Sequence, residues 1–197
     1  MFRLIESIRL FNGKFHNLEF HQERMDRSLT DLYQTFKRIE LTPLLGSLDF
    51  PRSGVYKCRV EYDHQSHRVE FVPYTFRSIK SLKKVESNSL SYEYKFSNRS
   101  GIDRLMKEKG NCDDILIIKN NFVCDCSYAN IVFKKKNQWF TPKTYLLRGT
   151  MRESLLKAGR ISELEIEVND IQQFEKFKLI NAMLGFDSPE CDISNIF

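Results

Sequence analysis

The feature that most constrains this fold is a series of short apolar segments joined in pairs by tight-turn residues. The first pair lies in LIESIRLFNGKFHNLEF, where two apolar-rich segments flank Asn12-Gly13, a dipeptide that favours the two-residue turn of a β-hairpin. Three more pairs follow, with turns at residues 63–66, 119–121 and 136–137. The core must therefore be built largely from hairpins, which need a helix or another sheet to cover their apolar face.

Helical periodicity between these hairpins indicates a mixed fold. Apolar residues recur every three or four positions over residues 19–38, which predicts a long helix. Shorter helices are predicted at 102–109, 152–158 and 172–177, and further strands at 163–168 and 178–184. We expect an α/β (mixed α+β) fold with a small N-terminal α/β domain at 1–86, a larger C-terminal α/β domain at 87–197, and a polar linker at 78–89.

The bulk properties are those of an ordered globular protein. Of the 197 residues 41% are hydrophobic, 16 are Phe, and no apolar run approaches the ~20 residues that span a bilayer. The N-terminus alternates apolar and polar residues and carries Glu6, so it is predicted to be a strand and not a signal peptide. We therefore expect a cytoplasmic protein without a membrane partner.

The cysteines and lysines suggest two further classes of site, and both are disfavoured. Cys124 and Cys126 would need a second pair of ligands to hold a metal, and the sequence has no such pair, so we expect reduced thiols and no metal. The net charge of +5 suits an anionic small substrate as well as nucleic acid. Lysines 134–136 precede a hairpin turn and 83–84 lie in a polar segment, so solvated loops are favoured and no nucleic acid is expected.

Three segments between Lys95 and Arg152 suit the binding of pyridoxal phosphate (PLP). Lys95 lies between Tyr94 and Phe96, and burial among apolar neighbours lowers the pKa of a lysine amine, as imine formation requires. Asp125 lies inside an apolar strand, where a carboxylate would hold a protonated pyridine nitrogen. Gly149-Thr150 opens a predicted helix, whose backbone N–H groups attract phosphate.

Each of these residues also has a simple structural explanation. Lys95 suits an ordinary surface lysine, Asp125 an acid on an edge strand, and Gly149-Thr150 an ordinary helix cap. The arginines of these segments are by default surface or helix-start charges: Arg24, Arg148 and Arg152. The order of the segments along the chain is what favours the cofactor.

In that order the chain resembles the class IV aminotransferase family, the fold-type IV PLP enzymes that include branched-chain and D-amino acid aminotransferases and aminodeoxychorismate lyase. His21 to Arg24 matches the H-x-x-R segment, whose arginine binds the cofactor phosphate. Lys95 with Asn98-Arg99 matches the lysine segment K-x-x-N-R. Asp125 stands where the family has the carboxylate that bonds to the ring nitrogen. The resemblance extends to Asn130, to Leu147 on the ring, to the phosphate-binding Gly149 and Thr150, to Met151-Arg152 of the lyase branch, and to the late phosphate loop at Asn181-Ala182.

The resemblance implies a two-lobed, D-amino acid aminotransferase-like fold with a shortened N-terminus, a cofactor site between the lobes, and a homodimer. It implies that Lys95 binds PLP and then acts as general base on a small-molecule amine substrate, while Asp125 keeps the pyridine protonated. Expulsion of an enolpyruvyl group would make the enzyme a 4-amino-4-deoxychorismate lyase that yields 4-aminobenzoate, a folate precursor, and pyruvate. Reprotonation at the cofactor carbon would make it a branched-chain or D-amino acid aminotransferase.

The lyase is favoured because Met151-Arg152 resembles that branch and Ile5 replaces a substrate-side Tyr of some aminotransferases. The chain departs from the family in two further residues. Asp125 replaces the usual Glu, which moves the carboxylate by roughly 1.5 Å, and Ala182 replaces Ser or Thr at the late loop. Asp125 and the shortened N-terminus keep open a PLP-binding protein without turnover. The candidates for binding the substrate carboxylate are Arg9, Arg59 and Arg77.

Overall fold

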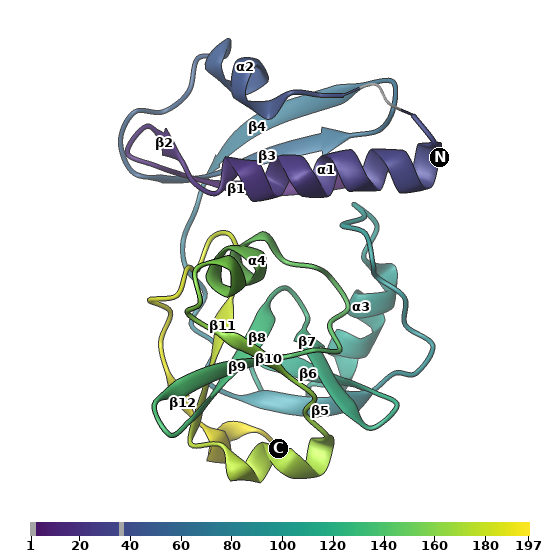
Figure 1. The fold of residues 1–197 in the computed structure, drawn as a ribbon, viewed down its shortest axis with the longest axis vertical. Coiled ribbons are helices and arrows are strands. Elements are labelled where there is room, and N and C mark those ends of the chain that lie inside the picture. Colours follow the sequence, from purple (N-terminus) through teal and green to yellow (C-terminus); the bar gives the residue numbers. More distant parts are fainter. Residues whose placement is uncertain (1–2, 36–37) are drawn as a thin grey trace. The chain divides into compact units, whose positions relative to one another are not determined.

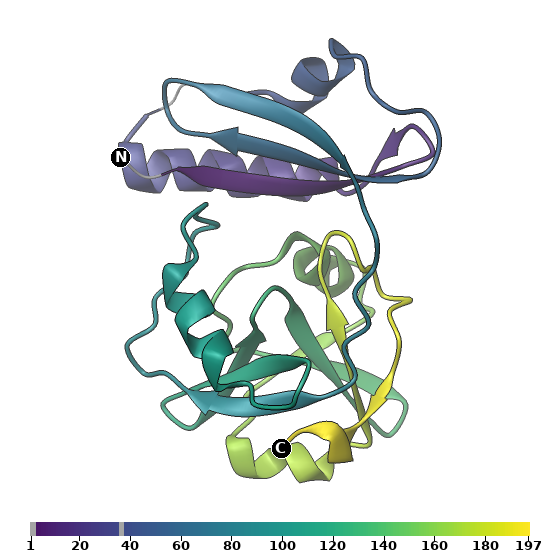
Figure 2. The same cartoon turned by 180° about the vertical axis from the view of Figure 1, so that it is seen from behind.

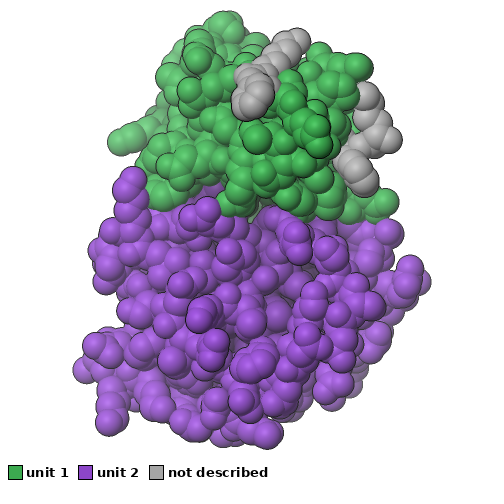
Figure 3. Space-filling model, turned by 45° about the vertical axis from the view of Figure 1, so that its right-hand side comes forward, with its two compact units in different colours: residues 1–76, 94–98 green, residues 77–93, 99–197 purple. Residues whose placement is uncertain are grey.

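The computed structural model describes residues 3–35 and 38–197, which form two compact units (Figure 3). Unit 1 comprises Met1–Phe76 and Tyr94–Asn98, and unit 2 comprises Arg77–Glu93 and Arg99–Phe197. The chain leaves unit 1 after Phe76, before the expected boundary at 86/87, because residues 82–86 form a strand of unit 2. It returns at 94–98 because this segment pairs with the first strand.

Unit 1 is a four-stranded antiparallel sheet with two helices, and two of its turns confirm the predicted hairpins (Figure 1). Asn12 and Gly13 have φ angles of 47° and 76°, the left-handed pair that a type I′ turn requires. The strands have the order β2-β1-β3-β4. The elements are β1 (Leu4–Phe11), β2 (Lys14–Phe15), α1 (Leu18–Tyr33), α2 (Leu41–Gly46), β3 (Val55–Tyr62) and β4 (His67–Pro73).

Helix α1 covers one face of this sheet (Figure 2). Its buried Met25 and Leu29 pack with Leu4 and Ile8 of β1 and with residues of β3. The helix ends at Tyr33, earlier than the predicted residue 38, because Gln34 takes a left-handed conformation with φ 51°. Phe36, which continued the periodic pattern, lies outside the described residues.

Unit 2 contains two sheets with short helices around them, which confirms the mixed α/β prediction. One sheet has three strands in the order β5-β6-β7, and the other has five in the order β10-β9-β8-β11-β12. The strands are β5 (Leu82–Glu86), β6 (Asp114–Lys119), β7 (Phe122–Cys126), β8 (Asn130–Lys135), β9 (Gln138–Pro142), β10 (Ser162–Leu164), β11 (Lys176–Ile180) and β12 (Cys191–Asp192). The helices are α3 (Ser100–Leu105), α4 (Thr150–Lys157) and the 3₁₀ turns η1 (Met106–Glu108), η2 (Val168–Gln173) and η3 (Ile193–Asn195).

Three predictions for unit 2 were wrong. The polar linker expected at 78–89 contains β5, which runs parallel to β6 and buries Leu82 and Val85. The two lysines between these residues interrupt the apolar pattern by which a strand is recognised. The strand expected at 163–168 ends at Leu164, because Ile166 accepts a hydrogen bond from Val123 of β7 and the chain leaves the edge of β9. The helix expected at 172–177 is the 3₁₀ turn η2, which begins four residues earlier.

The remaining elements lie close to their predicted places. The hairpins at 119–121 and 136–137 are confirmed, and each uses two residues with positive φ. The predicted helix at 102–109 is α3 followed by η1. In the described part of the chain, no helix has the length and apolarity to cross a membrane, and no cluster of three or more His, Cys, Asp or Glu side chains could hold a metal ion.

Candidate active site

Unit 1 holds a buried carboxylate, Glu6, on the core-facing side of β1. The strand alternates, so Leu4, Glu6 and Ile8 all point toward α1, and an unpaired carboxylate there would be costly. Arg24 on α1 donates from Nε to Glu6 Oε1 at 2.9 Å and from Nη2 to Oε2 at 2.5 Å. His21, one turn earlier, donates from Nδ1 to Oε2 at 2.6 Å. Arg24 is thus a buried partner of Glu6 and not the surface arginine taken as the default.

The electrostatics of this cluster leave Glu6 charged. Burial alone would raise the pKa of the Glu6 carboxyl, but the Arg24 charge and the His21 hydrogen bond outweigh burial and lower it from 4.5 to about 2. Burial lowers the pKa of His21, so this histidine is neutral and its Nδ1–H is directed at Glu6. The guanidinium of Arg24 is therefore held in one orientation by a carboxylate that stays ionised.

Lys95 belongs to the same unit because its segment pairs with β1. The Lys95 carbonyl accepts a hydrogen bond from Ile5 N–H at 2.9 Å, and Phe96 forms an antiparallel bridge with Leu4. The Lys95 side chain is half-buried, and its charge is among the groups that lower the pKa of His21. The amine thus lies close to the His21–Arg24 face of α1.

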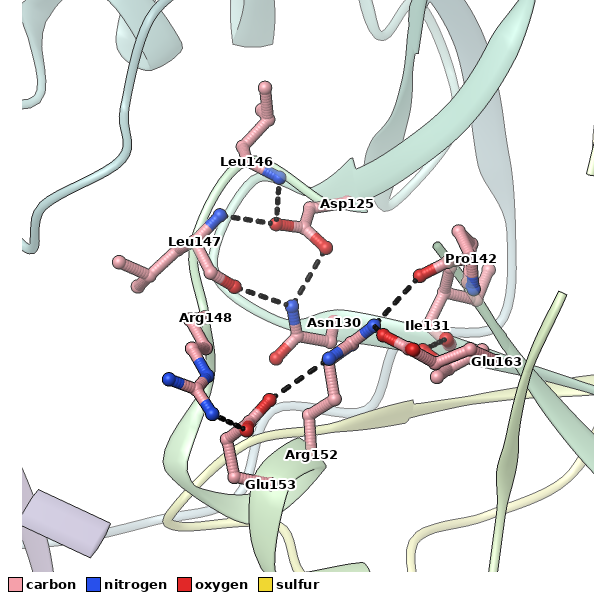
Figure 4. A network of polar contacts seen from close by, with 11 residues as sticks. Asp125, Asn130, Ile131, Pro142, Leu146, Leu147, Arg148, Arg152, Glu153 and Glu163 are labelled. Carbon is pink, nitrogen blue, oxygen red and sulfur yellow. Dashed lines mark hydrogen bonds and ion pairs between the residues drawn. The ribbon is translucent and has the colours of Figure 1, made fainter. Parts of the chain in front are cut away.

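Unit 2 holds a buried carboxylate, Asp125 on β7, whose hydrogen-bond donors among the described residues are all N–H groups (Figure 4). Its Oδ2 accepts from the backbone N–H of Leu146 and of Leu147, both at 2.9 Å. Its Oδ1 accepts from Nδ2 of Asn130 at 2.8 Å. Asp125 is therefore a buried acid on the edge strand β7, and not the surface acid of the structural explanation.

Asp125 differs from Glu6 because no side-chain cation of residues 3–35 or 38–197 bonds to it directly. Burial raises the pKa of the Asp125 carboxyl from 3.8 to about 6, even though the N–H groups of Leu147, Asn130 and Leu146 and the charge of Arg152 act in the opposite direction. A cationic partner at its remaining acceptor position would favour the ionised form. The site thus suits a protonated ring nitrogen.

Leu146 and Leu147, whose backbone N–H groups bond to Asp125, lie just before the start of α4. Leu147 is half-exposed, Gly149 is the N-cap residue and buried Thr150 is the first residue of the helix. The N-terminal N–H groups of a helix have no partners within the helix and attract anions. No side-chain hydrogen bond caps α4 in the described structure. These three predicted residues therefore lie beside Asp125, at a helix end that could hold a phosphate.

The late loop is fixed at the end of β11. Asn181 Oδ1 accepts from the backbone N–H of Met183 and of Leu184, both at 2.9 Å, and its Nδ2 donates to the Tyr128 carbonyl at 3.3 Å. Ala182 is half-exposed within this turn. Asn181 therefore shapes the loop, and a phosphate there could meet only backbone N–H groups at Ala182.

Arg152 is a structural residue that sequence reasoning misjudged as an ordinary helix-start charge. It is buried, and it donates to the Pro142 carbonyl at 3.1 Å, to Glu163 at 2.5 Å and to Glu153 at 2.9 Å (Figure 4). Glu153 also pairs with Arg148 at 2.6 Å. Arg152 thus fastens the first turn of α4 to the ends of β9 and β10.

Two further residues of these clusters were given no role from the sequence. Glu6 could have been found from the alternation of β1, because an acid between Leu4 and Ile8 on the apolar face must have a buried partner. Asn130 carried no comparable signal, since its role depends on contacts with residues that are distant in the sequence. The functional roles predicted for Lys95, Arg24, Asp125 and the residues of the loops stay predictions.

The donor set in unit 2 fits a phosphorylated pyridine. A carboxylate has about four lone-pair positions, and three of those on Asp125 are taken, which leaves one on Oδ1 for a ring N–H. The start of α4 offers a helix end for the phosphate. Unit 1, taken by itself, contains an amine, Lys95, and a buried guanidinium, Arg24.

Comparison with known proteins supports this interpretation. The model of the family amino-transferase class IV matches residues 65–186. An uncharacterized protein of Haemophilus influenzae is 36% identical over 188 residues, which cover 94% of this chain and 100% of the relative. A crystal structure of a candidate 4-amino-4-deoxychorismate lyase from Haemophilus somnus is 36% identical, with a TM-score of 0.89 over 94% of this chain and 98% of that one.

More distant structures share the fold. An aminotransferase from Brucella abortus, whose crystal structure contains the cofactor PLP, has a TM-score of 0.71 at 17% identity and covers 96% of this chain and 83% of that one. At this identity the likeness concerns the fold alone. It shows that a fold of this kind can hold PLP.

We expect Glu6→Gln to lower the free energy of unfolding by about 3 to 5 kcal/mol at pH 7, because it leaves Arg24 buried without its carboxylate. The pKa of Glu6 is lowered from 4.5 to about 2. Its contribution to the free energy of unfolding is therefore complete above pH 4.5 and is lost as the pH falls toward 2. Urea unfolding of wild type and variant, repeated at decreasing pH, should show the difference shrinking.

The matched control is Glu70→Gln, which removes a half-exposed carboxylate 3.5 Å from Arg59 on the same sheet. It should cost no more than about 1 kcal/mol. Equal losses for both variants, or a difference for Glu6→Gln that does not change between pH 7 and pH 2.5, would contradict the role given to the buried pair.

Proposed function

This chain belongs to the class IV aminotransferase family, and we propose on that basis that it is a PLP-dependent 4-amino-4-deoxychorismate lyase that forms 4-aminobenzoate and pyruvate. The observation that carries the proposal is the buried Asp125, which faces only N–H donors and keeps one acceptor position on Oδ1. The likeness to the Haemophilus somnus structure supports the choice of the lyase.

Each residue of the site has a distinct part in the proposed mechanism. PLP, when bound, supplies an electron sink for the bond that is broken in the substrate. Lys95 would hold the cofactor aldehyde, and its free amine would move the proton at the carbon that bears the substrate nitrogen. Asp125 would accept a hydrogen bond from a protonated ring nitrogen, and Leu147 would contact the ring.

The phosphate is proposed to be held by three groups: the start of α4, the late loop and Arg24. Gly149 and Thr150 offer the N-terminus of α4, and Asn181-Ala182 offers the backbone of the late loop. Arg24 offers a charge-assisted bond, and Glu6 and His21 keep its guanidinium in place. These contacts would resist the tilting of the ring when one amine replaces another.

Of the arginines considered for the substrate carboxylate, Arg9 is better suited than Arg59. Arg59 lies 3.2 Å from Glu61 and 3.5 Å from Glu70, which neutralise it. Arg9 has no carboxylate within ion-pair distance in the described structure, and its buried Nε has no hydrogen-bond partner there. Burial and, second to burial, the charge of Arg9 lower the pKa of His16, so this neighbour is neutral. An incoming carboxylate would satisfy Arg9.

The enzyme is further proposed to be a homodimer, as the family resemblance implies. Unit 1 supports this with three exposed apolar side chains, Phe11 (39%), Val72 (39%) and Phe76 (47%). Sedimentation equilibrium of the purified chain should give twice the mass of one chain, and Phe76→Ser should shift the equilibrium toward the monomer. A monomer at all concentrations would refute the dimer without bearing on PLP.

We expect the purified protein to bind PLP and absorb near the edge of the visible range, and borohydride to fix the cofactor on Lys95. Peptide mapping should find the adduct on Lys95, and Lys95→Ala should lose it. The control is Lys178→Arg, because burial lowers the pKa of the Lys178 amine and makes it a competitor for aldehydes. An adduct on Lys178 in wild type, or no uptake of PLP, would remove the cofactor proposal.

With aminodeoxychorismate as substrate, the holoenzyme should release 4-aminobenzoate and pyruvate in equal amounts. Lys95→Ala should lower kcat by about 10²- to 10⁴-fold, the usual contribution of a positioned general base. Exchange of amino groups between amino acids and keto acids, with no 4-aminobenzoate, would make the enzyme an aminotransferase. A bound cofactor whose spectrum no amine changes would mean binding without turnover.

We expect Arg9→Gln to raise KM by about 10- to 100-fold, because a hydrogen bond to a charged group contributes about 1.5 to 3 kcal/mol, and to leave kcat within a few-fold. Arg59→Gln is the matched control on the same sheet and should leave both constants unchanged. The same rise in KM for both variants would show a general effect of surface charge and not recognition by Arg9.

A further inference from the structure

Asn130, the first residue of β8, uses both hydrogens of its side-chain amide within the candidate site. Nδ2 donates to Asp125 Oδ1 at 2.8 Å and to the Leu147 carbonyl at 3.0 Å. Both partners are acceptors, so rotating the amide by half a turn would place Oδ1 against two oxygens. The side chain is also buried. Its orientation is therefore fixed by the two bonds that it makes.

The opposite atom of the same amide lies against Gly149. A Cβ atom on Gly149 would overlap Asn130 Oδ1, so only glycine fits at this position while the amide keeps its place. Gly149 has an extended backbone with φ −73°, which any residue can adopt, so the glycine is required by this contact and not by backbone strain. Asn130 thus contacts each end of the turn from Leu147 to Gly149.

Asn130 also determines which part of Asp125 is open. Oδ2 of Asp125 is filled by two backbone N–H groups, and the position left on Oδ1 lies beside the bond from Asn130. The direction of that open position depends on the carboxylate plane, which three donors from two segments define. Removing Asn130 would leave the carboxylate held on one oxygen only.

We propose that Asn130 is a positioning residue, which aims the open acceptor position of Asp125 at the ring nitrogen and with the same amide sets the Leu147–Gly149 turn against the ring and phosphate. The role of Asn130 toward the ring and the phosphate rests on the proposed function. The predicted linkage between Asn130, Asp125 and Gly149 rests on the contacts alone and is tested without cofactor.

The linkage has a readout in the ionisation of Asp125. Asn130 donates to the charged form, so its loss must raise the Asp125 pKa above the value of about 6. Arg152 of α4 is the cation whose charge reaches Asp125, and it is retained in every variant below. The charge of Asp125 also acts on the thiols of Cys124 and Cys126 on β7, and Asp114 of β6 acts on Cys126.

The experiment is a pH titration of the full-length apoprotein labelled with ¹³C at the aspartate carboxyls, with the Asp125 signal assigned by its absence in Asp125→Asn. In Asn130→Ala the midpoint should move upward by about one pH unit or more, the shift expected for losing a hydrogen bond to a charged group. Thr141→Val is the control, because buried Thr141 donates to the Ile131 carbonyl of the same sheet and does not touch Asp125.

A second variant tests the linkage if Asn130→Ala fails to fold. Gly149→Ala makes no contact with Asp125, yet it should displace the Asn130 amide and raise the Asp125 midpoint. In Asn130→Ala/Gly149→Ala the shift should be no larger than in Asn130→Ala alone, because both changes act through one amide. Additive shifts, or an unchanged midpoint in Asn130→Ala, would overturn the proposal.

Titration of the holoenzyme separates this inference from the proposed function. If PLP binds, the Asn130→Ala holoenzyme should change its absorbance with pH at a higher pH than wild type, whereas Thr141→Val should not. If the apoprotein shows the linkage but takes up no PLP, the positioning network is real and the proposed function fails. If PLP binds and Asn130→Ala leaves the midpoint and the spectrum unchanged, the positioning role alone fails.

Discussion

The polar organisation of unit 2 depends on how the carboxylate of Asp125 is held in an apolar sheet. Two backbone N–H groups and one amide supply the bonds, and none of these three donors can lose or accept a proton near neutral pH. The donors come from β8 and from the turn before α4. One buried acid therefore fixes the relative positions of a strand, a turn and a helix end within the unit.

Two of the buried acids, Glu6 and Asp125, show two different solutions to the cost of burial. Glu6 bonds directly to a guanidinium, and its pKa falls to about 2, so it is ionised at every physiological pH. Asp125 bonds to neutral donors, and its pKa rises to about 6, so it can still respond to a cation at its open position. The first arrangement suits a permanent anchor for Arg24, and the second suits a partner for a ring nitrogen that must be protonated.

The predictability of the fold follows from the range of the interactions involved. Turns such as Asn12-Gly13 are determined by local backbone preferences, so the hairpins could be placed from the sequence. Strand β5 could not, because its pairing with β6 is parallel and distant in sequence, and Lys83 and Lys84 interrupt its apolar pattern. The candidate site divides in the same way: Asp125 was found as an acid in an apolar strand, whereas the function of Asn130 depends on Leu147 and Gly149.

In the structure, Arg152 no longer distinguishes the lyase from the aminotransferase. Arg152 of the Met151-Arg152 pair is occupied by Pro142, Glu153 and Glu163, contacts that fasten α4 and serve either reaction equally well. Discrimination between substrates must then come from side chains that a substrate can reach. On β1 the side opposite the core carries Ile5, Ser7 and Arg9. Under the proposed function, this face would receive a substrate that has no carboxylate on the carbon bearing the reacting amine. Aminodeoxychorismate meets this condition, because both of its carboxylates are attached elsewhere.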